Sequence, residues 1–437
     1  MSTSAKYLPE VKEQYEDLPY PPRDPNDEKK RLVKTSLDLL EHINHFGFKG
    51  RETFKNGFRC LVAGGGTGDS TIHLAEQLKN IPNAEIIQID LSQASLNICK
   101  ERAKVRELTN IEWKQGSLLD VANLDIGKFD YINCSGVLHH LDSPKDGLNA
   151  LKSVLTEDGI IGVMVYAPYG RISVYPMQEA LRYVNHDTDD KQEKLQNAKN
   201  ILDNLPKEHF VNGNNLIQAE QQLFGDSGLY DILLHSQDRS YTVSQLYNWV
   251  EGCDLNIIRL YDELKKDRGY NPKYYIKDEN IAKKVAELSL KEQQSLAEIL
   301  NGSLYKHLLY VGKKSASDHI ASIKNKNLVP FFLGADKGAN LLVAKNMEQN
   351  LSQKMMVINQ KSLQTILPAT KEGIEIIKCI DGQNSIEQIL KRSEKKLRKS
   401  GIKSSSDMIE HIFADIYTRL NETENMFLRS KDVGDLR

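Results

Sequence analysis

Short apolar runs alternate with longer amphipathic stretches between residues 58 and 166 of the chain. The apolar runs predict buried strands at 60–63, 85–89, 111–114, 131–134 and 160–166. The stretches between them predict helices at 70–79, 93–106 and 145–155. Alternation of this kind is typical of a parallel sheet that is covered by helices on both faces. The pattern therefore predicts a doubly wound, Rossmann-like α/β domain.

Two polar, helix-rich stretches interrupt this alternation further along the chain. The first, at about 172–240, is too long for a simple crossover, so it predicts an inserted helical cap. A second helical excursion is expected at about 264–303. The strands that follow these stretches, at 255–261 and 307–311, suit an antiparallel edge pair that closes the sheet. The sheet domain with both insertions is expected to span 51–314.

Residues 1–50 predict an arm followed by a helix. The arm, up to about residue 30, is rich in proline and charge, so it resists regular structure but can pack on a surface. Apolar residues at helical spacing then predict a helix over 29–45.

Residues 315–437 predict a small C-terminal α+β domain. A strand at 354–359 precedes three short helices, and this order suggests a winged-helix-like arrangement. Thr370 stands where the first of these helices needs an N-cap, as Thr242 does for a helix over 242–252. The charge run at 391–403 is more typical of a solvated helix face than of a surface for a polyanion.

The composition restricts the expected partners and the expected cellular location. The chain has 58 Lys+Arg against 60 Asp+Glu, a formal net charge of −2, which argues against a nucleic-acid partner. Residues 1–7 lack the apolar core of a signal peptide, and the longest apolar stretch, at 160–167, is too short to span a bilayer. The five cysteines form no Cys-x-x-Cys pair, so no metal site is expected. These features predict a soluble, cytoplasmic protein without a membrane partner.

The turn after the first predicted strand holds the most informative chemistry. Gly64, Gly66 and Gly68 permit a tight turn and a close approach by a ligand. The second strand ends at Asp90, whose carboxylate can accept hydrogen bonds from both hydroxyls of a ribose. Asp69 stands where a dinucleotide-binding turn would carry glycine, and its charge would repel a pyrophosphate. A nucleoside with a cationic sulfur, S-adenosylmethionine, therefore fits better than a dinucleotide; a glycine-rich turn without a ligand is the remaining alternative.

From these motifs the chain resembles the class I S-adenosylmethionine-dependent methyltransferases over about residues 58–313. The matching segments are Gly64-Gly-Gly-Thr-Gly68, Asp90, Gly116-Ser-Leu118, Phe129–Leu141 and Asp158-Gly159. One departure is Val62, because the family usually has an acid two residues before the first glycine. Asn133-Cys-Ser-Gly136 also lacks the Asn/Asp-Pro-Pro-Tyr/Phe signature of amide and base N-methyltransferases.

The resemblance implies a donor site at the ends of the first four strands. It assigns the methionine part to the glycine turn, the ribose to Asp90, and the adenine to residues that follow Asp90 and the third strand. The implied donor-binding residues are Ala63, Gly64, Gly66, Gly68, Asp90, Leu91, Gly116, Ser117, Leu118, Ser135 and Gly136.

A narrower resemblance covers more of the chain. Gln14-Tyr15…Pro19-Tyr-Pro21, Val165–Arg171 and Gly228–Tyr241 are similar to a bacterial group of methyltransferases with an N-terminal extension, most of them without an assigned substrate. The helical insertion and the C-terminal region are more loosely similar to those of bacterial protein-lysine methyltransferases.

Methyl transfer from a sulfonium is an in-line displacement, so it needs positioning and removal of a proton from the nucleophile, and no metal. Tyr166 and Tyr169 either line the acceptor site or pack against the cap. His235 stands one helical turn after Asp231, so it is either a general base oriented by that carboxylate or part of a helix-surface pair.

Four other side chains have two readings. His139 and His140 are expected to be structural histidines rather than catalytic ones. Tyr15 and Tyr20 either fold over the site as a lid or brace the domain.

The leading hypothesis is a methyltransferase that uses S-adenosylmethionine. The acceptor is unidentified: a lysine or other amine on a protein competes with a small metabolite. A non-catalytic regulatory protein that binds S-adenosylmethionine, and a dinucleotide reductase, are the alternatives. An oligomer is compatible with the sequence.

Overall fold

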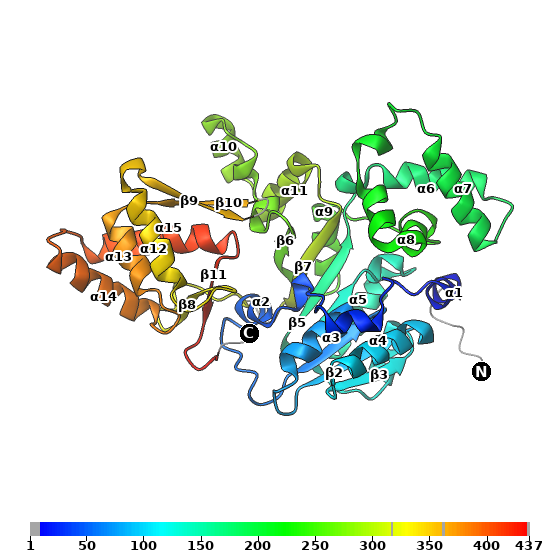
Figure 1. The fold of residues 1–437 in the computed structure, drawn as a ribbon, viewed down its shortest axis with the longest axis horizontal. Coiled ribbons are helices and arrows are strands. Elements are labelled where there is room, and N and C mark those ends of the chain that lie inside the picture. Colours follow the sequence, from blue (N-terminus) through cyan, green and yellow to red (C-terminus); the bar gives the residue numbers. More distant parts are fainter. Residues whose placement is uncertain (1–8, 316–317, 361–362, 435–437) are drawn as a thin grey trace.

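The computed structural model of the chain describes residues 9–315, 318–360 and 363–434 (Figure 1). The expected lack of a signal peptide concerns residues 1–7, which lie outside the described residues. Within the described part, no helix has both the length and the apolar character that crossing a membrane requires.

A seven-stranded sheet with the order β3-β2-β1-β4-β5-β7-β6 forms the centre of the molecule. Its strands are β1 Arg59–Ala63, β2 Glu85–Asp90, β3 Ile111–Gln115, β4 Phe129–Ser135, β5 Leu155–Tyr166, β6 Leu255–Tyr261 and β7 Lys306–Lys313. The first five are parallel, while β7 runs antiparallel to both β5 and β6. The predicted α/β sheet and its antiparallel edge are confirmed. The strand order reverses between β1 and β4, which is where ligands bind in open sheets of this kind.

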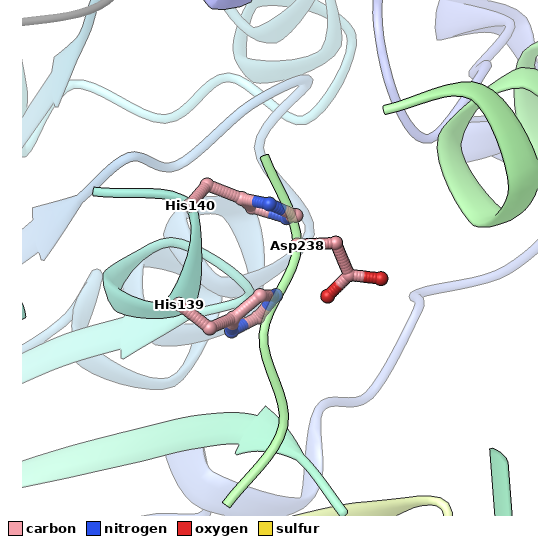
Figure 2. Close-up of side chains that lie close together, drawn as sticks. All are labelled: His139, His140 and Asp238. Atoms are coloured by element: carbon pink, nitrogen blue, oxygen red, sulfur yellow. The ribbon is translucent and has the colours of Figure 1, made fainter. Parts of the chain in front are cut away.

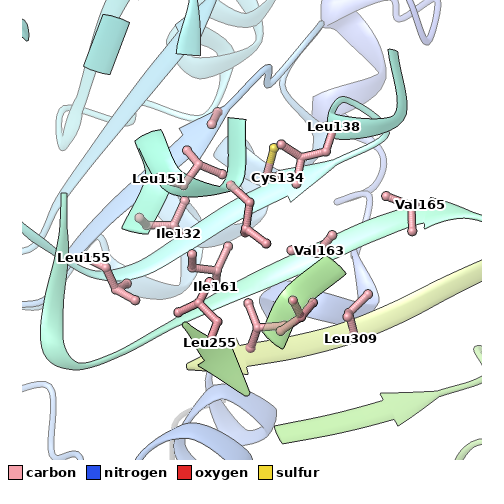
Figure 3. Packing of buried hydrophobic residues seen from close by; sticks show 14 of the residues in the cluster. Ile132, Cys134, Leu138, Leu151, Leu155, Ile161, Val163, Val165, Leu255 and Leu309 are labelled. Carbon is pink, nitrogen blue, oxygen red and sulfur yellow. The ribbon is translucent and has the colours of Figure 1, made fainter. Parts of the chain in front are cut away.

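Helices cover both faces of the sheet, as the uninterrupted apolar strands require. They are α3 Asp69–Leu78 and α4 Gln93–Val105 on one face, and α5 Pro144–Ser153 and α9 Val243–Glu251 on the other. Alternate residues of a strand belong to opposite cores: Leu61 packs with the α5 and α9 side, and Val62 with the α3 and α4 side. Figure 3 shows the first of these cores, where Ile132, Ile161 and Val163 pack beneath Leu151.

The predicted helix over 29–45 is wrong. The chain forms short turns instead: η1 Pro25–Lys29, η2 Ser36–Asp38, α2 Leu40–His42 and a π-helical turn, η3 Ile43–Gly47. Long-range hydrogen bonds hold this path, because the Thr35 amide donates to His73 Nδ1, and the fully buried Asp38 carboxylate accepts from Tyr131 and Asn133. The apolar residues of this segment are nevertheless buried, among them Leu37, Leu40 and Ile43. Their spacing therefore indicated which residues enter the core, but it did not indicate a continuous helix.

Both interruptions of the sheet pattern are helical, as predicted. The cap contains α6 Val174–Val184, α7 Lys191–Asp203 and α8 Leu216–Leu234, and it has a hydrophobic core of its own. Gly225 breaks α8 with non-helical dihedral angles. The second excursion contains α10 Glu279–Ala286 and α11 Leu290–Asn301. Thr242 caps α9 in a capping box, as expected.

The C-terminal region forms a separate core and lies on the far side of the molecule from the cap (Figure 1). It comprises β8 Val329–Phe332, α12 Ala339–Gln349, β9 Met355–Gln360, β10 Leu363–Pro368, α13 Lys371–Cys379, α14 Ile386–Lys399, α15 Ser406–Asn421 and β11 Met426–Arg429. Thr370 caps α13 as expected. The β9–β10 hairpin precedes the three helices, so the winged-helix interpretation stays a prediction. The ring of Phe427 in β11 stacks on the ring of His45, with the ring centroids 4.5 Å apart. This contact joins the C-terminal region to the segment that packs on the sheet.

Candidate functional site

The glycine turn joins β1 to α3 in left-handed backbone conformations. Gly64, Gly66 and Gly68 have φ angles of 74°, 52° and 100°, which other residues adopt at a steric cost. Gly68 is the N-cap of α3. The turn thus exposes main-chain groups, instead of side chains, at the sheet's carboxyl edge.

Asp90, the last residue of β2, faces this turn. Its carboxylate accepts hydrogen bonds from the amides of Gly66 at 2.7 Å and Ser92 at 2.9 Å. Burial raises the pKa of Asp90 above its ordinary value, against these hydrogen bonds, which lower it. A carboxylate has about four acceptor sites, so two amides leave acceptor capacity for ribose hydroxyls. The structure therefore joins the turn and the acid, as the sequence predicted.

The other expected donor-binding residues follow neighbouring strands. Leu91 follows β2, while Gly116 follows β3 and its amide donates to the Asp90 carbonyl. Ser117 caps the short turn η4 Leu118–Asn123. Ser135 is the last residue of β4 and pairs with Met164 of β5, and the amide of Gly136, the next residue, donates to the Met164 carbonyl. All of these positions lie at the carboxyl ends of parallel strands, where a nucleoside would bind.

An N-terminal arm, made of α1 Pro9–Asp17 and the residues up to Asp24, lies across the glycine turn. The Thr67 hydroxyl donates to the Pro21 carbonyl at 2.6 Å, and the Ser92 hydroxyl donates to the Tyr15 carbonyl at 3.0 Å. A Cβ atom on Gly66 would lie 2.6 Å from the Tyr20 carbonyl oxygen. Gly66 therefore accommodates the arm, a contact that the sequence pattern did not reveal.

A chain of ion pairs fixes this arm. Arg23 bonds to Asp69 at 2.6 Å, Asp69 bonds to Arg102 at 2.8 Å, and Arg102 bonds to Glu28 at 2.7 Å. Burial raises the pKa of Asp69, but Arg23 and Arg102 more than offset this and hold it below its ordinary value. The role of Asp69 here is structural anchoring. No local pattern in the sequence marks Arg23 or Arg102 as its partners.

Three tyrosine hydroxyls converge on two carboxylates of α8. Tyr15 donates to Asp231 at 3.0 Å, Tyr166 lies 3.5 Å from the other oxygen of Asp231, and Tyr20 donates to Glu220 at 3.1 Å. We call these five residues the carboxylate–tyrosine cluster. Two of its tyrosines come from the arm, one from β5, and both acids from the cap.

Burial dominates the electrostatics of this cluster. Asp231 is 5% exposed, and its desolvation raises its pKa to about 7. This pKa already includes the negative charges of Glu220 and Asp238, which add to the rise, and the Tyr15 hydrogen bond and Arg171, which oppose it. The pKa of Glu220 is also raised by burial. A carboxylate whose pKa lies near neutrality is suited to proton transfer.

His235 is buried, which contradicts the reading of a helix-surface pair. Its ring stacks on His140 at 3.7 Å, its Nδ1 accepts from the Gln237 amide, and burial lowers its pKa well below the ordinary value. The structure gives the Asp231 carboxylate to Tyr15 rather than to this imidazole. Tyr169 lies in the turn η6 Tyr169–Arg171, three residues after Tyr166, and it does not belong to the carboxylate–tyrosine cluster.

His139, His140 and Asp238 lie together beside the cluster, with potential ligand atoms within 4.8 Å of one another (Figure 2). Two imidazoles and a carboxylate are a donor set that suits divalent transition metals. Asp238, however, already pairs with Arg171 at 3.0 Å and accepts from Gln178 at 2.9 Å. The guanidinium beside this carboxylate would repel a metal cation.

Residues 61–161 match the protein family described as a methyltransferase domain. The matched segment contains the glycine turn and Asp90. An uncharacterized protein from Synechococcus is 32% identical over 262 residues, covering 58% of this chain and 60% of that protein. The tRNA 5-carboxymethoxyuridine methyltransferase of Escherichia coli K12 is 30% identical over 113 residues, covering 26% of this chain and 41% of that enzyme. The chain thus spans less than two thirds of the length of both relatives.

The methyltransferase domain and its additions also share a fold with a solved structure. PKMT2 from Rickettsia typhi superimposes with a TM-score of 0.62 at 16% sequence identity, covering 91% of this chain and 76% of that chain. The superposition covers 91% of this chain, so the shared fold extends well beyond residues 61–161.

Proposed function

We propose that this chain is an S-adenosylmethionine-dependent methyltransferase whose donor lies beyond the carboxyl ends of β1, β2 and β4. The observation that carries the proposal is the glycine turn held against the Asp90 carboxylate at the point where the strand order reverses. The match of residues 61–161 to a methyltransferase domain supports it. So does the solved complex of PKMT2 from Rickettsia typhi with AdoHcy, which has the same fold.

The position of each residue along the sheet edge then determines which part of the donor it contacts. Ala63, Gly64, Gly66 and Gly68 present main-chain groups to the methionine part, and Ser135 and Gly136 border it. Asp90 accepts the ribose hydroxyls, while Leu91 and Gly116–Leu118 surround the adenine. The donor supplies an activated methyl group, so the chain has to orient an acceptor and remove its proton.

The arm covers the donor as a lid in this proposal, with Tyr15 and Tyr20 on its inner side. Residues 51–314, with the cap and the second excursion, act as the methyltransferase domain, and residues 315–437 act as a docking module. The acceptor is a protein amine or a small metabolite. The five free, buried cysteines suit a cytoplasmic location, and the near-neutral charge makes a nucleic-acid acceptor the less favoured one.

Calorimetry with AdoHcy tests the donor site. We expect binding by the wild type, and an affinity loss of about 1–3 kcal/mol in Asp90→Ala, because hydrogen bonds to the ribose are lost. Asp203→Ala, an exposed change at the end of α7, is the control and should bind normally. An absence of heat with the wild type at millimolar AdoHcy refutes the proposal.

Incubation with tritiated donor and host-cell extract tests turnover. Label in protein or in small molecules supports an enzyme and separates the two acceptor classes. Binding of AdoHcy without any transfer of label would instead favour the non-catalytic regulatory protein.

A further inference from the structure

We propose that the carboxylate–tyrosine cluster is the acceptor site for a cationic amine, with Asp231 as the group that takes the amine proton and Tyr15 as its positioning residue. The inference rests on the proposed methyltransferase function. It moves the role of base from His235, where the sequence placed it, to the carboxylate one helical turn earlier.

The cluster adjoins the donor site through a short chain of contacts. Ser92 donates its amide to Asp90 and its hydroxyl to the Tyr15 carbonyl, and the Tyr15 hydroxyl reaches Asp231. Tyr15 therefore contacts both Ser92, which binds the proposed ribose acid Asp90, and Asp231, the proposed base. Tyr20 repeats the arrangement, since its carbonyl lies against Gly66 and its hydroxyl against Glu220.

Charge favours a cationic occupant. Within the described residues, neither Asp231 nor Glu220 forms an ion pair with a lysine or arginine. Arg171 is engaged by Asp238 and stacks 3.6 Å above the Tyr166 ring. The positive charge of Arg171 lowers the pKa of both carboxylates but does not offset their burial, because the pKa of each stays raised. Two largely buried acids that form no ion pair in the described part of the chain favour a cationic occupant, and the rings of Tyr15 and Tyr20 add favourable cation–π contacts.

Two buried imidazoles at the border of the cluster supply a second, independent observation that points to a ligand. His139 is fully buried, packs 4.1 Å from the Tyr166 ring, and both of its ring nitrogens lack a hydrogen-bond partner among the described residues. His235 is 4% exposed, lies 6.0 Å from the Tyr15 ring, and its Nε2 is likewise unpartnered within that part of the chain. Buried polar atoms are normally satisfied, so an occupant or ordered water is expected here.

The chemistry balances with these groups alone. The ammonium gives one proton to the Asp231 carboxylate, which becomes a neutral acid. The lone pair of the neutral amine forms the N–CH3 bond while the C–S bond breaks, and its electron pair stays on sulfur. The products are a methylated ammonium and AdoHcy, and the Asp231 proton leaves to solvent when the arm opens.

Sinefungin provides a probe that needs no knowledge of the acceptor. It is a donor analogue in which a carbon bearing an amino group replaces the methylated sulfur, so its ammonium points to where the methyl group would be transferred. We expect the full-length protein to prefer sinefungin to AdoHcy in calorimetry. Asp231→Asn should lower that preference by at least about tenfold and change AdoHcy affinity by less than about threefold.

Two further variants make the test specific. Asp226→Asn changes an exposed acid on the same helix, and its preference should equal that of the wild type. Tyr15→Phe removes a hydrogen bond that lowers the pKa of Asp231, so the pH at which the sinefungin preference appears should move upward. Glu220, Asp238, Arg171, Tyr166 and Tyr20 also face Asp231, and they are unchanged in these variants.

The outcomes are distinguishable. A wild type that binds AdoHcy but whose sinefungin preference survives Asp231→Asn overturns this assignment and leaves the methyltransferase proposal standing. A wild type that binds neither compound overturns both. Tritium transferred from the donor and recovered after acid hydrolysis as an N-methylated amine supports the amine class, whereas label in an ester, ether or thioether overturns it.

Discussion

The hydroxyl of Tyr15 lies 3.0 Å from Oδ1 of Asp231, although the two residues are 216 positions apart in the chain. The main-chain carbonyl of the same tyrosine accepts a hydrogen bond from the hydroxyl of Ser92, two residues after Asp90. The arm therefore contacts both the cap, through Asp231, and the carboxyl edge of the sheet, through Ser92.

Removing the Arg23 side chain should loosen the arm. The Arg23–Asp69 pair is mostly buried, with side-chain exposures of 18% and 17%, so Arg23→Ala should cost about 1 kcal/mol of arm docking. Hydrogen exchange of the amides of residues 9–24 should rise, and AdoHcy should dissociate faster. Lys29→Ala, at an exposed position of the same segment, is the control. Unchanged exchange in Arg23→Ala would show that Asp69 does not anchor the arm.

Adding a single carbon at Gly66 should displace the arm. A Cβ there would lie 2.6 Å from the Tyr20 carbonyl, and the φ of 52° disfavours a side chain. In Gly66→Ala we expect tryptic cleavage at Arg23 to accelerate by at least about tenfold, because cleavage follows the opened population. Gly213→Ala is the control, since no atom lies within 4 Å of its Cβ position. Equal cleavage rates in the two variants would contradict the contact.

Arg102 should matter for global stability. It is fully buried and holds Glu28, Asp69 and the Thr67 carbonyl together. Arg102→Ala removes one of two arginine partners from each acid, since Asp69 keeps Arg23 and Glu28 keeps Arg106, and it also leaves the Thr67 carbonyl without its hydrogen bond. The loss of these buried hydrogen bonds to charged groups should lower the free energy of unfolding by about 3 kcal/mol in urea titrations. Lys104→Ala removes an exposed ion pair with Glu101 on the same helix and should cost less than about 0.5 kcal/mol. A similar, small loss in both variants would mean that the buried network contributes little.

The sheet, and the meeting of the glycine turn with Asp90 at its edge, were predictable from the sequence for physical reasons. Strands such as β1 and β5 are buried on both faces, so their apolar runs are continuous and easy to recognise. The glycine turn and Asp90 are separated by one strand–helix–strand unit, and the topology of such units brings their strand ends to one edge. Capping by Thr242 and Thr370 depends on local sequence alone, and both predictions are confirmed.

Features held by distant partners were not predictable in this way. Residues 29–45 have helical spacing, but the buried Asp38 and its bonds to Tyr131 and Asn133 impose another path. The pairing of Tyr15 and Tyr20 with acids of α8 depends on how the arm crosses the sheet edge, for which no single segment carries a signal. Asp231 was recognised only as a neighbour of His235, because its burial is a property of the assembled cap.

Asp231 should make the protein less stable as the pH rises. Its pKa is about 7 in the folded protein against 3.8 for the free side chain, so between these values the native state holds a proton that the unfolded state releases. Stability from this group is therefore highest below about pH 4 and falls as the pH rises to about 7. At pH 8 the buried charge should cost on the order of a few kcal/mol, and Asp231→Asn removes that cost. Urea unfolding at pH 8 should show Asp231→Asn to be more stable than the wild type, with the gain shrinking towards pH 4, while Asp226→Asn follows the wild type at both. A variant that is less stable than the wild type at pH 8 would mean that the carboxylate is compensated in the folded state, and would remove the electrostatic reason for a cation at this site.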